Sequence, residues 1–154
     1  MKLLWQISDF VRKMRREMRF GELSRAPMHL LRFELVGDTA ECDWVARPAD
    51  PWDSDLRPSI GPRNETMQAL KDAIVVREML FSSLPEICTA TFRVYRQADE
   101  TASELIIAGT VTREDDAPQG IRSIAMRAKL CGLRFWLNNG VLGALQSEEC
   151  PLSA

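Results

Sequence analysis

A two-residue turn between two alternating apolar runs constrains the fold of this chain more than any other feature. Gly37-Asp38 divides residues 30–47 into these two runs, and Gly-Asp is a dipeptide that closes tight β-hairpins. A turn of this length also fixes which residues lie opposite one another. One face is predicted to carry Leu31, Phe33 and Leu35 opposite Trp44, Cys42 and Ala40. Both strands then place their apolar residues on the same face, so we expect a sheet with one buried side.

The remaining elements follow from apolar spacing and from capping residues. Spacings of three and four residues predict helices over 3–20, 64–84 and about 118–131. Alternation predicts a second strand pair over 87–96 and 104–113, joined by a polar loop.

Two further segments are marked by turn-forming residues. Asn139-Gly140 predicts a final hairpin between 133–137 and 141–145, although the second of these runs also fits a helix. Residues 48–63 contain four prolines and a glycine, and are expected to form a loop.

The order of these elements, α-ββ-α-ββ-α-(ββ), indicates an α+β fold. We expect a mostly antiparallel sheet of four to six strands with helices on one face. A chain of 154 residues fits a single domain. The expected organisation is a basic amphipathic helix over 1–21, an α+β domain over 22–147 and a flexible tail over 148–154.

The charges are distributed unevenly along the chain. The net charge of −2 argues against a protein whose whole surface is built for nucleic acid. However, residues 1–25 hold seven basic side chains against three acidic ones, whereas residues 38–55 hold six acidic side chains against one arginine. Such an asymmetry can steer partners toward the chain, including other copies of the same chain.

The cysteines and the hydropathy pattern bear on location. The four cysteines are far apart and form no C-x-x-C pair, so a reducing compartment is the simpler interpretation. No apolar stretch approaches the ~20 residues that cross a bilayer, and the N-terminus lacks a convincing secretory signal. We therefore expect a cytoplasmic protein without a transmembrane segment.

The basic N-terminal helix is the clearest functional candidate. Its opposite faces differ, because Trp5, Arg12 and Arg16 lie across from an apolar seam made of Leu4, Ile7, Val11, Met14 and Met18. The seam either docks on its own domain or mediates self-association. The cationic face either is solvated or binds phosphate groups or an anionic membrane, with Trp5 as an aromatic anchor.

Three more side chains are candidates for ligand or partner contacts. Arg77 falls within the apolar arc of the second helix, so it requires either an anionic ligand or a carboxylate partner, for which Asp43, Glu34 and Glu41 are the choices. Trp52 and Trp136 have no evident internal partner, and exposed tryptophans are common at protein contacts. A pocket beneath the loop could equally hold Trp52.

The polar face of the first hairpin offers a candidate for metal chemistry. Arg32 is predicted to lie opposite Asp43, and Glu34 opposite Glu41. The string over 40–46, AECDWVA, resembles the acidic strand of metal-dependent nucleases of the restriction-endonuclease type. That resemblance implies a metal-dependent hydrolase using Glu41 and Asp43. It covers seven residues and departs from the family where a lysine is expected.

Other catalytic groups are scarce in the sequence. His29 is the only histidine, and neither a Walker-type loop nor a G-x-G-x-x-G motif is present. Asp50, Asp53 and Asp55 lack the spacing of a calcium loop. We therefore assign no catalytic, cofactor-binding or metal-binding residue, and expect no cofactor.

The leading hypothesis is a non-catalytic interaction or regulatory module that forms homodimers, with a further protein partner also conceivable. The first alternative is binding of an anionic ligand or RNA through the basic N-terminal helix, although the net acidity argues against nucleic acid. The second alternative is the metal-dependent hydrolase built on the acidic hairpin.

Overall fold

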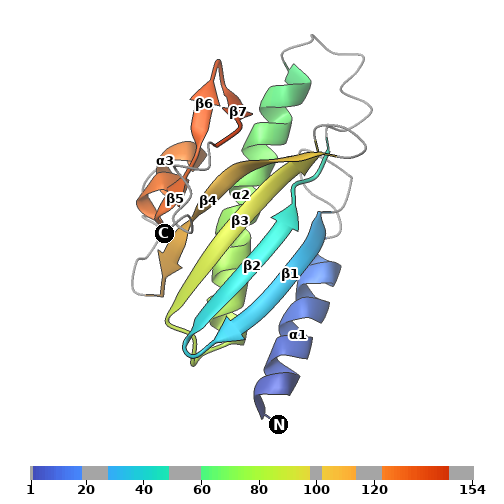
Figure 1. Ribbon diagram of the computed structural model, residues 1–154, viewed down its shortest axis with the longest axis vertical. Coiled ribbons are helices and arrows are strands. Elements are labelled where there is room, and N and C mark those ends of the chain that lie inside the picture. The colour runs from blue at the N-terminus through green and yellow to red at the C-terminus, as the bar shows by residue number, and fades with distance from the viewer. Residues whose placement is uncertain (1, 19–27, 49–59, 98–101, 114–122, 146–154) are drawn as a thin grey trace.

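The computed structural model describes residues 2–18, 28–48, 60–97, 102–113 and 123–145 (Figure 1). Within these residues the helices are α1 (Lys2–Glu17), α2 (Ile60–Ser83) and α3 (Ile124–Leu130). The strands are β1 (His29–Val36), β2 (Thr39–Val45), β3 (Thr89–Gln97), β4 (Ser103–Thr112), β5 (Leu133–Arg134), β6 (Trp136–Asn138) and β7 (Val141–Gly143). The chain therefore has the α+β fold predicted from its pattern of elements.

The main sheet has the strand order β1-β2-β3-β4-β5, and β6 and β7 form a separate two-stranded sheet. Neighbouring strands of the main sheet are antiparallel except β2 and β3. These two are parallel because α2 connects them and carries the chain back along the sheet. Figure 1 shows α1 and α2 behind the sheet, and α3 packs against α2. Among the described residues, helices thus cover one face of β1 to β4 and leave the other face uncovered.

The core lies between the sheet and these helices. Alternate residues of β2 and β3 point into it, and Trp44 and Phe92 meet there edge to face, with ring centroids 5.3 Å apart. From α2, Leu70, Val76 and Leu80 fill the opposite side and are fully buried. Within the described residues, none of the helices combines the length and apolar character needed to cross a bilayer.

The first hairpin forms as predicted, but with one correction to its register. Phe33 lies opposite Cys42 and Leu35 opposite Ala40, whereas Leu30, not Leu31, lies opposite Trp44. A β-bulge between Leu30 and Arg32 is the reason, because an extra residue shifts the alternation by one. Leu31 is consequently 53% exposed.

The start of α2 is also corrected. The helix begins at Ile60 rather than at Asn64, so residues 60–63 are helical and not part of a loop. Pro62 is compatible with this position, because the first turn of a helix needs no backbone N–H donor. The rest of the expected loop, residues 49–59, lies outside the described residues.

The C-terminal elements follow their capping and turn residues. The helix expected over 118–131 is observed from Ile124, where the Ser123 side chain accepts a hydrogen bond from the backbone N–H of Met126; residues 118–122 lie outside the described residues. Asn139 and Gly140 have φ values of 54° and 79°, as the predicted tight turn between β6 and β7 requires. The run after this turn is therefore a strand.

Candidate functional site

The basic helix α1 docks on its own domain. Phe10, Met14 and Met18 are buried in the core, and the rings of Phe10 and Phe33 lie 4.9 Å apart. The hypothesis that Met14 and Met18 form a seam for a second chain is therefore wrong. Because α1 lies next to the sheet of its own domain, its apolar side packs against that domain. Ile7 and Val11 remain only partly buried.

The core is incompletely covered where α1 meets β1. In the described part of the chain, eight hydrophobic residues pack against the core while only partly buried, and six of them come from α1, from β1 or from the residue before β1. We call this group the open edge; it consists of Ile7, Val11, Met28, Leu30, Phe33 and Leu35. By contrast, the inward residues Trp44 and Phe92 of the central strands are fully buried. The difference arises because β1 is the last strand of the sheet.

The backbone of β1 adds to this exposed surface. Within the described ranges β1 ends the sheet, and a terminal strand presents N–H and C=O groups that no neighbouring strand pairs. Val36, like Leu31, is a large apolar side chain that is mostly exposed, at 59%. Apolar residues and unpaired backbone groups together are the features that favour contact with another polypeptide.

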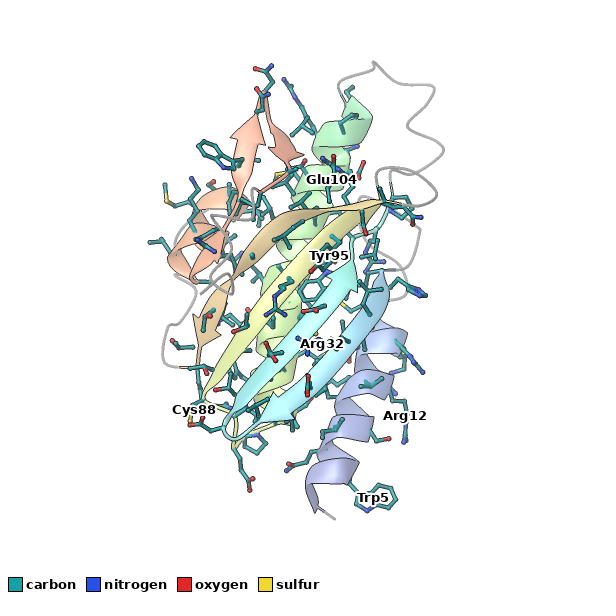
Figure 2. The ribbon with its side chains drawn as sticks, viewed as in Figure 1. Trp5, Arg12, Arg32, Cys88, Tyr95 and Glu104 are labelled. Atoms are coloured by element: carbon teal, nitrogen blue, oxygen red, sulfur yellow. The ribbon has the colours of Figure 1, made fainter. Side chains whose placement is uncertain are left out.

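A charged network occupies the uncovered face of the sheet, where Figure 2 shows Arg32. Arg93 donates hydrogen bonds to Asp43 and Glu41, both at 3.1 Å. Arg32 donates to Asp43 at 3.3 Å and also pairs with Glu34 and Glu41. Arg32 therefore bridges the carboxylates of Glu34 and Glu41, which the hairpin alone would bring together.

This pairing defines the chemistry of the acidic hairpin. The hydrogen bond from Arg93 is the main cause of the lowered pKa of Glu41, so this side chain stays ionised. Both carboxylates of the nuclease-like string thus face guanidinium groups. Among the described residues, no cluster of three or more His, Cys, Asp or Glu side chains could hold a metal ion. The described residues therefore offer no set of metal ligands for the metal-dependent hydrolase hypothesis.

Arg77 is buried, and its partner differs from those expected. Its Nη2 donates a 2.8 Å hydrogen bond to the carbonyl of Thr112, and its guanidinium lies over the Phe81 ring. None of the three carboxylates proposed from the sequence pairs with it, because Asp43, Glu34 and Glu41 belong to the network on the other face of the sheet. Arg77 thus joins α2 to the end of β4.

The exposed candidates of α1 lie together. At 100° per residue, Trp5, Arg12 and Arg16 fall within about 40° of one another on the side away from the core. Trp5 is 71% exposed, and Arg12 and Arg16 are exposed as well. Figure 2 shows Trp5 and Arg12 projecting outward from the helix. The structure therefore provides a cationic, aromatic face on a rigidly docked helix.

Of the other two tryptophan candidates, the described one does not join this face. Trp136 lies on β6 and is 57% exposed. Trp52 lies outside the described residues. The structure thus brings Trp5, Arg12 and Arg16 together, but places Asp43, Arg77 and Trp136 elsewhere.

A buried ion pair was missed by the sequence interpretation. Arg47 Nε and Asp72 Oδ2 are 2.7 Å apart, and Gln68 donates to the other oxygen of Asp72 at 2.9 Å. Burial raises the pKa of Asp72 despite these bonds. The three residues border a cavity of about 270 Å³ between the helices. In the sequence, the contact between Gln68 and Asp72 is indicated by their spacing of four residues, which places them on one helix face.

Cys42 is poorly placed for nucleophilic catalysis. Cys42 is fully buried, and this burial raises the pKa of its thiol well above the ordinary value. A protonated thiol inside the core is a weak nucleophile. His29 is exposed at the start of the edge strand β1.

No protein-family model, curated protein or solved structure matches this chain. Its function is therefore argued from the surfaces described above, and not from likeness to another protein.

Proposed function

We propose that this protein is a non-catalytic interaction module that self-associates through the open edge. The observation that carries the proposal is the gathering of six half-buried core residues at the junction of α1 and β1. A second copy seated there would remove this apolar surface from water, which is the main driving force of most protein association. The unpaired backbone of β1 would gain partners in the same step.

The remaining chemistry supports an interaction module over an enzyme. The acidic residues Glu41 and Asp43 are engaged by Arg32 and Arg93, and the Cys42 thiol is held protonated in the core. We also propose a cytoplasmic location, since Cys42, Cys88 and Cys131 are free thiols and Cys88 is exposed.

Self-association predicts that the mass in solution rises with concentration. Lysine at both Leu31 and Val36 is expected to weaken the dimer at least about tenfold, because charged side chains on an edge strand oppose pairing. Sedimentation equilibrium measures the dissociation constant directly. The two replaced side chains are mostly exposed, so the folded monomer should keep its circular dichroism spectrum and thermal midpoint.

The matched control places two lysines at Met126 and Leu130 of α3, which are each 49% exposed. This control variant should dimerise as the wild-type chain does. A wild-type chain that is monomeric at every concentration contradicts self-association. A dimer lost in the α3 variant but kept in the β1 variant contradicts the assignment to the open edge.

A second candidate function rests on Trp5. A large aromatic side chain that is 71% exposed beside Arg12 and Arg16 has no structural explanation in the packing of α1. The spacing suits an anionic polymer such as RNA, with the phosphates on the arginines and a base stacked on the indole.

This second candidate predicts retention on heparin and salt-dependent binding to single-stranded RNA. Glutamate at Arg12 and Arg16 should abolish retention, and Trp5→Ala should weaken RNA binding about tenfold, in line with the loss of one stacked base. Fluorescence anisotropy over a salt series measures both effects. Lys129→Glu, on α3, is the charge control. Elution of the wild-type chain at low salt would rule this function out.

A further inference from the structure

The open edge has a chemical character that narrows what can occupy it. Its centre is apolar and consists of Ile7 and Val11 on α1 with Phe33 and Leu35 on β1, all four partly buried against the core. Figure 1 shows α1 running alongside β1 behind the sheet, and the contact between Phe10 and Phe33 confirms that the two elements are adjacent. The surface is thus an apolar strip bounded by a strand and a helix.

The border of this strip on α1 is cationic. Arg12 and Arg15 are both exposed, and at 100° per residue Arg15 lies about 40° from Val11, with Arg12 about 60° further around the helix. Figure 2 shows Arg12 projecting outward from α1. A fitting occupant therefore combines an apolar or aromatic anchor with acidic side chains close to it, because such charges are attracted to this border.

The chain itself contains one segment of this composition. Residues 49–59 read ADPWDSDLRPS, in which Trp52 is flanked by Asp50, Asp53 and Asp55. The aromatic anchor matches the apolar strip, and the three carboxylates match the arginines of α1. Tryptophan is also the residue type most enriched among the side chains that dominate binding energy at protein interfaces.

We propose that the open edge of one copy binds residues 49–59 of a second copy, with Trp52 against the apolar strip and the aspartates against Arg12 and Arg15. This inference rests on the proposed self-association and names its contacts. It also explains why the chain carries opposite charges in two separate places, since attraction between the basic helix of one copy and the acidic segment of the next favours encounter. Two such contacts form in a symmetric dimer.

The decisive experiment is a charge exchange between two variants of the full chain. The first variant carries Asp53→Lys and Asp55→Lys, and the second carries Arg12→Glu and Arg15→Glu. Each alone should raise the dimer dissociation constant at least about tenfold, because like charges then meet at both contacts. An equimolar mixture should dimerise again, since every contact in the mixed dimer pairs opposite charges. Native mass spectrometry distinguishes mixed from unmixed dimers.

A peptide of residues 49–59 provides a second test that does not depend on how the variants fold. Labelled at its N-terminus, it should bind the wild-type chain in fluorescence anisotropy and compete with dimer formation. The Trp52→Ala peptide and a peptide with all three aspartates replaced by asparagine should each bind at least about tenfold more weakly. Trp5→Ala in the full chain should leave peptide binding unchanged, which separates this site from RNA binding.

The outcomes separate this inference from the proposed function. A wild-type dimer that is weakened by lysines on β1, yet unaffected by either charge reversal, overturns the role of residues 49–59 and leaves self-association standing. A monomeric wild-type chain overturns both. Recovery of dimers in the mixture, together with binding of the peptide, supports the inference.

Discussion

Gly109→Ala is expected to lower the free energy of unfolding by about 3 kcal/mol, at the upper end of the usual cost of overpacking. A Cβ atom at this position would lie 2.3 Å from the carbonyl oxygen of Gly132 and 3.0 Å from Cα of Leu133. Both neighbours are backbone atoms, so the strain cannot be relieved by turning a side chain. The pairing of β4 with β5 would have to open, and β5 holds the C-terminal elements to the sheet.

Gly132→Ala should be at least as damaging. Its Cβ would lie 2.4 Å from the carbonyl oxygen of Thr110, and its φ of +105° is strained for any residue with a side chain. Chemical denaturation followed by circular dichroism measures both losses. Gly143→Ala is the matched control, because its Cβ would meet only the Cβ of Trp136 at 3.9 Å. Equal stability of the Gly109 and Gly143 variants would show that β4 and β5 do not approach this closely.

Asp72→Ala is expected to cost about 3–5 kcal/mol of stability, because it removes one partner of a buried ion pair. Arg47 and Asp72 are only 2% and 4% exposed. The double variant Arg47→Met, Asp72→Leu should recover most of the loss, since apolar residues of similar volume often replace a buried ion pair without penalty. A double-mutant cycle based on urea unfolding measures the coupling between the two residues.

The surface pair of Arg96 and Glu104 provides the control for this cycle. It has the same 2.7 Å separation but is much more exposed, so Glu104→Ala should cost less than about 1 kcal/mol. If Asp72→Ala proved no more harmful than Glu104→Ala, burial of the Arg47 pair would be refuted.

The raised pKa of Asp72 adds a pH dependence with a definite sign. At pH values between the ordinary pKa of an aspartate and this raised pKa, Asp72 is protonated in a larger fraction of the folded chains than of the unfolded chains. The unfolding free energy contributed by this group therefore falls as the pH rises through that interval. In variants that lack Asp72, this decrease of the unfolding free energy with rising pH should be absent.

Much of the fold could be predicted from the sequence because its signals are local. The turns at Gly37-Asp38 and Asn139-Gly140 need backbone conformations that few residues adopt, so they fixed two hairpins. The bulge at Leu31 could not be seen in this way, since the alternation of apolar residues continues through it. The start of α2 was misjudged because Pro62 was taken to end regular structure, although a first turn accepts it.

The candidate site was predicted only in part, for a related reason. The sequence predicted that Trp5, Arg12 and Arg16 lie on one face of α1, because helical periodicity alone brings these three positions to the same side. The open edge was not predicted. Its members come from α1, from β1 and from the residue before β1, and their partial burial depends on which strand ends the sheet.

The sequence by itself determined the helices, the hairpins and the side of α1 that faces solvent, because each of these features depends on residues that are close together in the sequence. The tertiary structure alone decided that Met14 and Met18 belong to the core, that Arg93 pairs with Glu41 and Asp43, and that Arg77 is held by a carbonyl group. These partners are distant in sequence. For Arg93, the pairing with Glu41 and Asp43 follows from the parallel alignment of β2 and β3, which no local pattern records.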